Sequence, residues 1–295
     1  MTKIASILIL SVLFFGGCKK GETNHGNTGI VKYTILNLTV MLDLSDRISP
    51  KVDGTQVQKD MGLIKQIVES FKDQIMRRNN LPATKDILRI VVYPQGNYII
   101  TNNLDKDLVV DFSSLSLNEK RELLHNFESS MIAAIEKIYE HASNAKNFNG
   151  SDIFNFIKHQ AVNYCVKPNY KNVLTIFSDG YMYFQNAQYN TGNRYSYMLE
   201  SSPFMSGLRN SKDLKKDISA GNYGFVSTGV SLKGLEVICL EFQPGKTNPI
   251  DFDIMKIFWS DWFKDMKIEE DKIHIYRSDL VSNTVATLKS HIKAN

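Results

Sequence analysis

The sequence predicts an α/β fold in which a doubly wound, mostly parallel central sheet carries helices on both faces. Strand-like and helix-like segments alternate along most of the chain, which is the pattern of such folds. The segments 34–44, 172–180 and 234–242 are almost uninterrupted apolar runs. Runs of this kind are typical of strands that are buried on both faces of a parallel sheet.

The first half of the chain begins this alternation. The strand at 34–44 is followed by 56–78, where apolar residues recur every three or four positions. That spacing places them on one stripe of an amphipathic helix. The segment 86–96 predicts a second strand, and we expect the short strands of a hairpin-like stretch at 97–102 and 107–112.

In the second half of the chain the alternation continues, and polar residues mark the starts of two predicted helices. Ser116 and Glu119 have the spacing of a capping box, which predicts the start of a long helix. Ser151 or Asp152 is a suitable N-cap for the next helix. The remaining expected elements are strands at 172–180, 234–242 and 272–276, a helix at 251–267, and a C-terminal helix that carries Val281, Val285, Leu288 and Ile292.

Residues 184–232 interrupt this alternation. They lack a clear period and are rich in Tyr, Asn, Ser and Gly. A loop of this length within a domain is usually functional or disordered. We expect an insertion that covers the edge of the sheet, with short helices near 203–218. It is either a recognition surface or a loop that packs on itself, and Tyr and Asn suit adaptable contacts.

The N-terminus has the pattern of a processed leader. Lys3 precedes an apolar run, 4–15, that is too short to span a membrane. The following Gly-Gly-Cys resembles the lipobox of bacterial lipoproteins, which implies cleavage before Cys18 and a lipid on its thiol. The alternative is an ordinary secretory signal with a chance cysteine.

These features give the expected domain organisation. It consists of a signal peptide, 1–17, a flexible Gly- and Asn-rich tether, 18–32, and one domain, 33–295, that contains the insertion. The implied location is the bacterial cell envelope, with the outer membrane favoured and the N-terminal lipid as the membrane contact.

Two further cysteines and the net charge limit the possible classes of function. Cys165 and Cys239 lie in apolar segments, so we expect buried free thiols, with a disulfide as the alternative. The formal net charge is +4 and the basic residues are scattered, which gives no reason to propose a nucleic-acid partner.

Polar residues follow two of the predicted strands directly. The motif Asp43-Leu-Ser45-Asp46-Arg47 follows the first strand, and Ser178-Asp179-Gly180 follows the strand 172–177. In an open parallel sheet, ligands bind outside the carboxyl ends of the strands. We therefore expect both motifs beside each other at the carboxyl ends of the strands, which we call the edge of the sheet.

The order of these motifs resembles a von Willebrand factor A-like domain, which has a Rossmann-like sheet. In that family, Asp-x-Ser-x-Ser, a Thr from a second loop and a later Asp form a metal-ion-dependent adhesion site (MIDAS). Matched by position, the resemblance implies that Asp43, Ser45, Ser151 and Asp179 hold a divalent cation, Mg²⁺ above all. It implies a partner protein or peptide that supplies a carboxylate. Asp46, Arg47 and Tyr181 flank these positions and are expected to contact that ligand.

Arg47 departs from the family pattern, which has Ser at this position. Arginine stays protonated and has no lone pair for a metal. We therefore expect a degenerate site in which Arg47 bridges Asp43 and Asp179 and weakens or replaces the metal. Alternatively, the two carboxylates only satisfy backbone amides, and Ser151 is only an N-cap.

Three functions are compatible with this sequence. The first is a membrane-tethered, non-enzymatic module that binds an envelope protein or peptide in adhesion or assembly. The second is a metal-dependent, phosphatase-like hydrolase that uses Asp43 and Asp179. No histidine falls in the predicted edge loops, so the hydrolase lacks an obvious proton-transfer group. The third, a structural subunit of an envelope complex, is not separable from the first by sequence.

Overall fold

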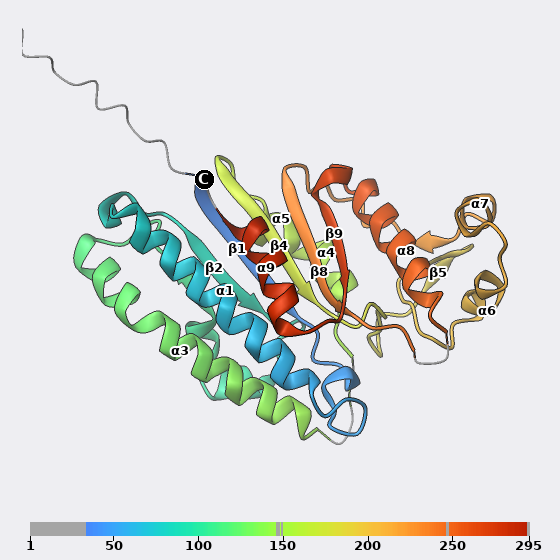
Figure 1. Cartoon of the computed structure of the whole chain (residues 1–295), viewed down its shortest axis with the longest axis horizontal. Helices are drawn as coiled ribbons and strands as arrows, with labels where there is room; N and C mark the ends of the chain where they lie inside the picture. Colours follow the sequence, from blue (N-terminus) through green and yellow to red (C-terminus); the bar gives the residue numbers. More distant parts are fainter. Residues whose placement is uncertain (1–33, 146–147, 149, 246–247, 294–295) are drawn as a thin grey trace, which may run out of the picture. The chain divides into compact units, whose positions relative to one another are not determined.

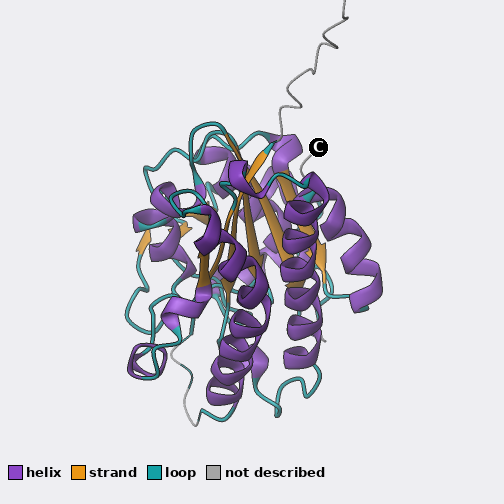
Figure 2. Ribbon diagram, turned by 90° about the vertical axis from the view of Figure 1, so that its left-hand side faces the viewer, coloured by secondary structure: helices purple, strands orange, loops and turns teal. Residues whose placement is uncertain are grey.

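A computed structural model describes residues 34–145, 148, 150–245 and 248–293. Its main sheet has the order β3-β2-β1-β4-β8-β9, and every pairing except β3 with β2 is parallel. Helices cover both faces (Figures 1 and 2). The expected doubly wound, mostly parallel α/β fold is confirmed. The strands are β1 (Ile35–Leu42), β2 (Ile87–Val91), β3 (Val109–Asp111), β4 (Tyr170–Phe177), β8 (Leu235–Phe242) and β9 (Ile273–Arg277).

Alternating side chains of the strands enter two separate apolar cores. In β1, Leu36, Leu38 and Val40 contribute to one core, and Met41 contributes to the other. This alternation follows from the period of two residues along a strand. The first core lies under α1 (Gln56–Arg78), α3 (Leu117–Ser143) and α9 (Val281–Ile292). The second lies under α4 (Ile153–His159), α5 (Ala161–Cys165) and α8 (Asp251–Asp265).

Helix starts agree with the local sequence. Ser116 and Glu119 form the expected capping box at the start of α3. At α4 the cap is Asp152, whose Oδ1 accepts a hydrogen bond from the Asn155 amide at 3.0 Å. The hydroxyl of Ser151 is therefore not required for the cap and is available to the neighbouring loop.

The expected hairpin-like stretch after β2 is wrong in its first half. Residues Asn97–Thr101 form a helix, α2, and the 3₁₀ turn Asp105–Leu108 leads into the short antiparallel edge strand β3. Ile99 is buried in the first core, while Ile100 remains exposed. Tertiary burial of one isoleucine thus outweighs the strand preference of the pair. The other 3₁₀ turns are Asp46–Ile48, Leu81–Ala83 and Glu270–Lys272.

The insertion forms a small layer beside α8. It contains α6 (Pro203–Arg209), α7 (Leu214–Ala220) and a three-stranded sheet, β5-β6-β7, which spans Asn190–Thr191, Arg194–Tyr195 and Gly224–Phe225. Phe225 packs edge-on against Trp259 and Trp262 of α8. Figure 1 shows α6 and α7 on the far side of α8 from the main sheet. Most of the insertion is therefore anchored by aromatic packing and does not cover the sheet edge.

Both described cysteines are free and buried. Burial raises the pKa of the Cys165 thiol to about 12, which keeps it protonated and unreactive. Cys18, the predicted signal peptide and the predicted tether lie outside the described residues. None of the described helices combines the length and the apolar character that a membrane span requires.

Candidate functional site

The two motifs meet at the point where the strand order of the sheet reverses. β1 and β4 are parallel neighbours, and the remaining strands extend outward from this pair in both directions. Asp43 follows β1, and its amide donates a hydrogen bond to the carbonyl of Phe177 at 2.9 Å. Asp179 follows β4 two residues later. Such a reversal is where α/β sheets bind ligands.

Hydrogen bonds fix the buried carboxylate of Asp43. Its Oδ1 accepts from the amide of Ser45 at 3.0 Å, and its Oδ2 accepts from the hydroxyl of Ser178 at 3.0 Å. Asp43 is only 2% exposed and Ser178 is fully buried. These contacts anchor the loop after β1, in which Ser45 is half-buried and Asp46 is exposed.

Ser151 joins this loop from a different element. Its Oγ accepts a hydrogen bond from the amide of Leu44 at 2.9 Å. The preceding residue, Gly150, has φ of 82°, and a Cβ there would overlap the main chain of Tyr183. The N-cap of α4 is Asp152 and not Ser151, and the role of Ser151 as a metal ligand stays a prediction.

Arg47 does not form the bridge that we expected between Asp43 and Asp179. Its guanidinium is buried and forms two hydrogen bonds with the carboxylate of Asp60, at 2.8 and 3.0 Å. A further hydrogen bond, at 3.1 Å, goes to the main-chain carbonyl of Asp43 rather than to its carboxylate. The forked geometry of arginine matches one carboxylate best. Asp60 supplies that carboxylate, so the guanidinium of Arg47 does not bridge Asp43 and Asp179.

Asp60 is the functional neighbour that the sequence analysis missed. It is fully buried on α1 and also accepts hydrogen bonds from Tyr139, at 2.8 Å, and from Gln56, at 2.8 Å. Gln56 in turn donates to the buried Glu241 at 3.1 Å. One signal was present, because Asp60 lies three residues after Val57 and four before Ile64, on the buried stripe of the helix.

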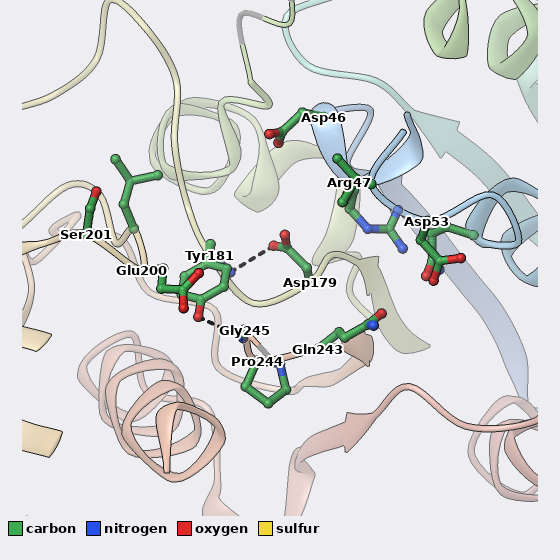
Figure 3. A pocket seen from close by; sticks show the side chains of 13 residues that line it. Asp46, Arg47, Asp53, Asp179, Tyr181, Glu200, Ser201, Gln243, Pro244 and Gly245 are labelled. Atoms are coloured by element: carbon green, nitrogen blue, oxygen red, sulfur yellow. Dashed lines mark hydrogen bonds between the residues drawn. The ribbon is translucent and has the colours of Figure 1, made fainter. Parts of the chain in front are cut away.

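The residues of the two motifs line two adjoining hollows. The smaller, of about 490 Å³, is lined by Asp43, Ser45, Asp46 and Asp179 together with aromatic residues that include Tyr181. The larger, of about 620 Å³, shares Asp46, Asp179 and Tyr181 with it and adds the side of Arg47 (Figure 3). All the predicted site residues in the described part of the chain therefore gather at this edge, with Ser151 next to the lining residue Gly150.

The carboxyl group of Asp179 has an unusual pKa. Burial and the nearby charge of Asp43 raise it from the ordinary 3.8 to about 7, although Arg47 and a hydrogen bond from the Tyr181 amide lower it. Two carboxyl groups without a cation between them resist joint ionisation. In the described part of the chain, neither Asp43 nor Asp179 forms an ion pair. The site therefore has an electrostatic preference for a cation.

Tyr181 is held by a second charged pair. Its hydroxyl donates to Asp251 at 3.0 Å, and Arg209 forms two hydrogen bonds with the same carboxylate, at 2.8 and 2.7 Å. Asp251 is fully buried at the start of α8. The ring of Tyr181 thus lines both hollows while its hydroxyl is occupied. Neither Asp251 nor Arg209 was expected, because their contact depends on how the insertion packs.

Only a short part of the insertion reaches the site. Leu199, Glu200 and Ser201 line the larger hollow, and Leu199 also lines the smaller one. The expectation that 184–232 covers the edge therefore applies to this stretch alone. The helices α6 and α7 pack beside α8 instead, because their apolar residues, such as Phe204 and Ile218, belong to the second core.

We predict that Arg47→Ala lowers the free energy of unfolding by about 3–5 kcal/mol, because it leaves Asp60 buried without its cation. Urea denaturation measures the change. The control Lys65→Ala removes an exposed ion pair with Glu136 and should cost less than about 1 kcal/mol. A loss below 1 kcal/mol for Arg47→Ala would contradict the assigned pair.

We also predict a pH-dependent effect of Asp179→Asn in the presence of a chelator. Between about pH 4 and 7 the folded state retains a proton on Asp179 that the unfolded state releases, so the contribution of this group to stability falls as the pH rises through this window. The Asn variant has no titrating group at this position and therefore does not lose stability for this reason. Its stability relative to wild type should rise from pH 4.5 to pH 8 in urea denaturation, whereas the exposed control Asp105→Asn should show no such trend. A constant difference across this range would refute the raised pKa.

Comparison with known proteins gives distant structural similarity only. No protein family matches the sequence, and no curated protein is similar enough to count as a relative. The chain is similar to proximal thread matrix protein 1 from the mussel byssus, at 12% identity and a TM-score of 0.35. A structure of that protein with a zinc-occupied MIDAS motif gives 14% identity and a TM-score of 0.35.

The pilus adhesin SpaC from Lactobacillus rhamnosus GG is similar at 10% identity and a TM-score of 0.41. The matches cover 88% of this chain but 47% of the mussel protein and 30% of the adhesin, so the chain spans less than half the length of either. At this level of similarity, no conclusion about the present site follows.

Proposed function

We propose that the protein is a binding module that holds a divalent cation at the edge of its sheet and accepts an acidic group of a partner protein or peptide there. The observation that carries this proposal is the meeting of Asp43, Ser45, Asp46 and Asp179 around one hollow at the strand reversal. Of these, Asp43, Ser45 and Asp179 are positions at which the sequence resembles the metal-ion-dependent adhesion site of von Willebrand factor A-like domains, and Asp46 lies at an intervening position.

The donor atoms fit a hard cation. Three carboxylates and the Ser45 hydroxyl line the hollow, and Mg²⁺ or Mn²⁺ prefers oxygen ligands and retains several waters. Ser151 would complete the set from the second loop. Because Arg47 is paired with Asp60, its charge does not occupy the place between the carboxylates. The site is therefore degenerate in sequence, since one hydroxyl is missing, but it retains the charge that attracts a cation.

The larger hollow can accommodate side chains of a partner peptide. Its lining mixes apolar side chains, Leu199 and Pro244, with polar ones, Glu200 and Gln243, around the ring of Tyr181. A partner carboxylate could meet the cation while neighbouring side chains of the partner occupy this hollow. Such an arrangement gives both charge-dependent affinity and side-chain selectivity.

A metal-dependent hydrolase is the second candidate, and one observation favours it. The raised pKa of Asp179 is of the kind found in general acids and bases. Asp43, however, is almost fully buried and both of its oxygens accept hydrogen bonds, so it is poorly placed to act as a nucleophile. No histidine is among the described residues that line the two hollows. Binding is therefore the better-supported function.

The location at the cell envelope is part of the same proposal and is supported by the sequence alone. A lipid on Cys18 would attach the domain to a bacterial membrane through the tether 18–32. An envelope protein or peptide would then be the natural class of partner. A structural role within an envelope complex would use the same surface.

We predict that the wild-type protein binds one Mn²⁺ and that Asp43→Asn and Asp179→Asn each weaken this binding at least about tenfold, because each removes a negative charge from the hollow. Isothermal titration calorimetry measures both affinities. The matched control is Asp105→Asn, which changes an exposed aspartate away from the site. Equal Mn²⁺ affinity in all four proteins, or none in wild type, would reject the cation site.

Cys18→Ala should release the protein from the membrane fraction into the soluble fraction, because it removes the thiol that carries the predicted lipid. Fractionation of cells followed by immunoblotting measures the distribution. Cys239→Ala is the matched control, since that thiol is buried in the domain. A Cys18→Ala protein that remains in the membrane fraction after a salt wash would show that the lipid anchor is wrong.

A further inference from the structure

A second group of potential metal ligands lies at the amino ends of the strands, opposite the edge that carries Asp43 and Asp179. Glu236 is the second residue of β8, His274 is the second residue of β9, and His291 lies in the last turn of α9. β8 and β9 are parallel to β1 and β4, so these residues occupy the amino ends of the strands, whereas Asp43 and Asp179 follow the carboxyl ends.

The side chains converge on one oxygen atom. The Oε1 of Glu236 lies 2.7 Å from the Nδ1 of His291 and 3.3 Å from the Nε2 of His274. One potential donor atom from each of the three residues falls within 4.8 Å of the others, and the imidazole rings are 4.0 Å apart. Tetrahedral zinc binds nitrogen and oxygen at about 2.0–2.2 Å, which places its ligand atoms roughly 3.3 Å apart. The distance of 3.3 Å between Oε1 and Nε2 already meets that requirement, whereas the 2.7 Å contact between Oε1 and Nδ1 would have to lengthen when a metal binds.

Metal binding would shift the proton of His291 between its ring nitrogens. As the side chains lie, Nδ1–H donates to Oε1 of Glu236 at 2.7 Å, and Nε2 accepts from the hydroxyl of Tyr276 at 3.0 Å. A proton on Nε2, donated to the Tyr276 oxygen, would free Nδ1 for a metal. Lys171 faces the other oxygen of Glu236, at 4.0 Å, and also donates to the main-chain carbonyls of His291 and Lys293. Oε1 therefore remains as the single carboxylate donor.

The site is partly open to solvent. The side chains of Glu236, His274 and His291 are 10%, 19% and 16% exposed. Three protein ligands with access to water match a zinc site that keeps its fourth position for a water molecule. Two imidazoles select a borderline cation such as Zn²⁺ over Mg²⁺, which prefers oxygen ligands.

We propose that Glu236, His274 and His291 form a site for a zinc-type divalent cation that joins α9 to β8 and β9. This site is separate from the proposed cation site at Asp43 and Asp179 and differs from it in ligand chemistry. A cation here would connect the C-terminal helix α9 to the strands β8 and β9. It would stabilise the folded state because the unfolded chain does not bring the three ligands together.

The test uses the full-length protein, with Zn²⁺ affinity measured by competition with a chromophoric chelator and Co²⁺ as the spectroscopic probe. We expect one equivalent of bound Co²⁺ with the visible absorption of a tetrahedral complex. His291→Ala and Glu236→Gln should each weaken Zn²⁺ binding at least about tenfold. The control His125→Ala removes an exposed histidine of α3 and should leave the affinity unchanged.

A second measurement keeps the result clear if one variant is unstable. Zn²⁺ should raise the thermal unfolding midpoint of wild type, of His125→Ala and of Asp43→Asn, but not of Glu236→Gln. Glu236→Gln preserves the shape of the side chain, and its fold can be checked by circular dichroism. The proposal is overturned if Zn²⁺ affinity is unchanged in both cluster variants. It is also overturned if the Co²⁺ absorption persists in them and is lost in Asp43→Asn.

Discussion

The buried ion pair between Arg47 and Asp60 is the interaction on which the character of the site depends. A guanidinium so close to Asp43 and Asp179 would neutralise them if it were free to turn toward the edge. Asp60 prevents this by binding the guanidinium through two hydrogen bonds, with Tyr139 and Gln56 fixing the other sides of the carboxylate. Arg47 stands where the family motif has a Ser ligand, and this ion pair buries its charge in the interior. The guanidinium therefore does not lie between the carboxyl groups of Asp43 and Asp179.

The topology of the sheet determines where that charge lies. Because β1 and β4 are parallel neighbours at the strand reversal, the loops after them meet without a helix between them. The hydrogen bonds from Ser178 to Asp43 and from Leu44 to Ser151 then join three loops into one unit. The insertion contributes only its stretch 199–201 to the hollow, while aromatic packing holds the rest against α8. The hollow is therefore lined mainly by these joined loops, with a short segment of the insertion as an additional wall.

Much of the fold could be predicted from the sequence because it rests on periodic burial. The apolar run of β1 and the stripe of α1 depend on local patterns, and the meeting of Asp43 with Asp179 follows from parallel strands. The helix at 97–101 could not be predicted, since burial of Ile99 outweighs local preference. The partner of Arg47, the Asp251 pair and the Glu236 cluster were missed for a shared reason. Each joins residues from separate elements, and no spacing along the chain encodes their contact.

The central claim is that a cation, and not Arg47, occupies the space between the carboxylates of Asp43 and Asp179. Crystals soaked in Mn²⁺ and measured at the manganese absorption edge test it most directly. We expect an anomalous peak within bonding distance of the oxygen ligands around Asp43, Ser45 and Asp179, with Arg47 still paired to Asp60. The absence of such a peak, with the guanidinium of Arg47 lying between the two carboxylates, would contradict it.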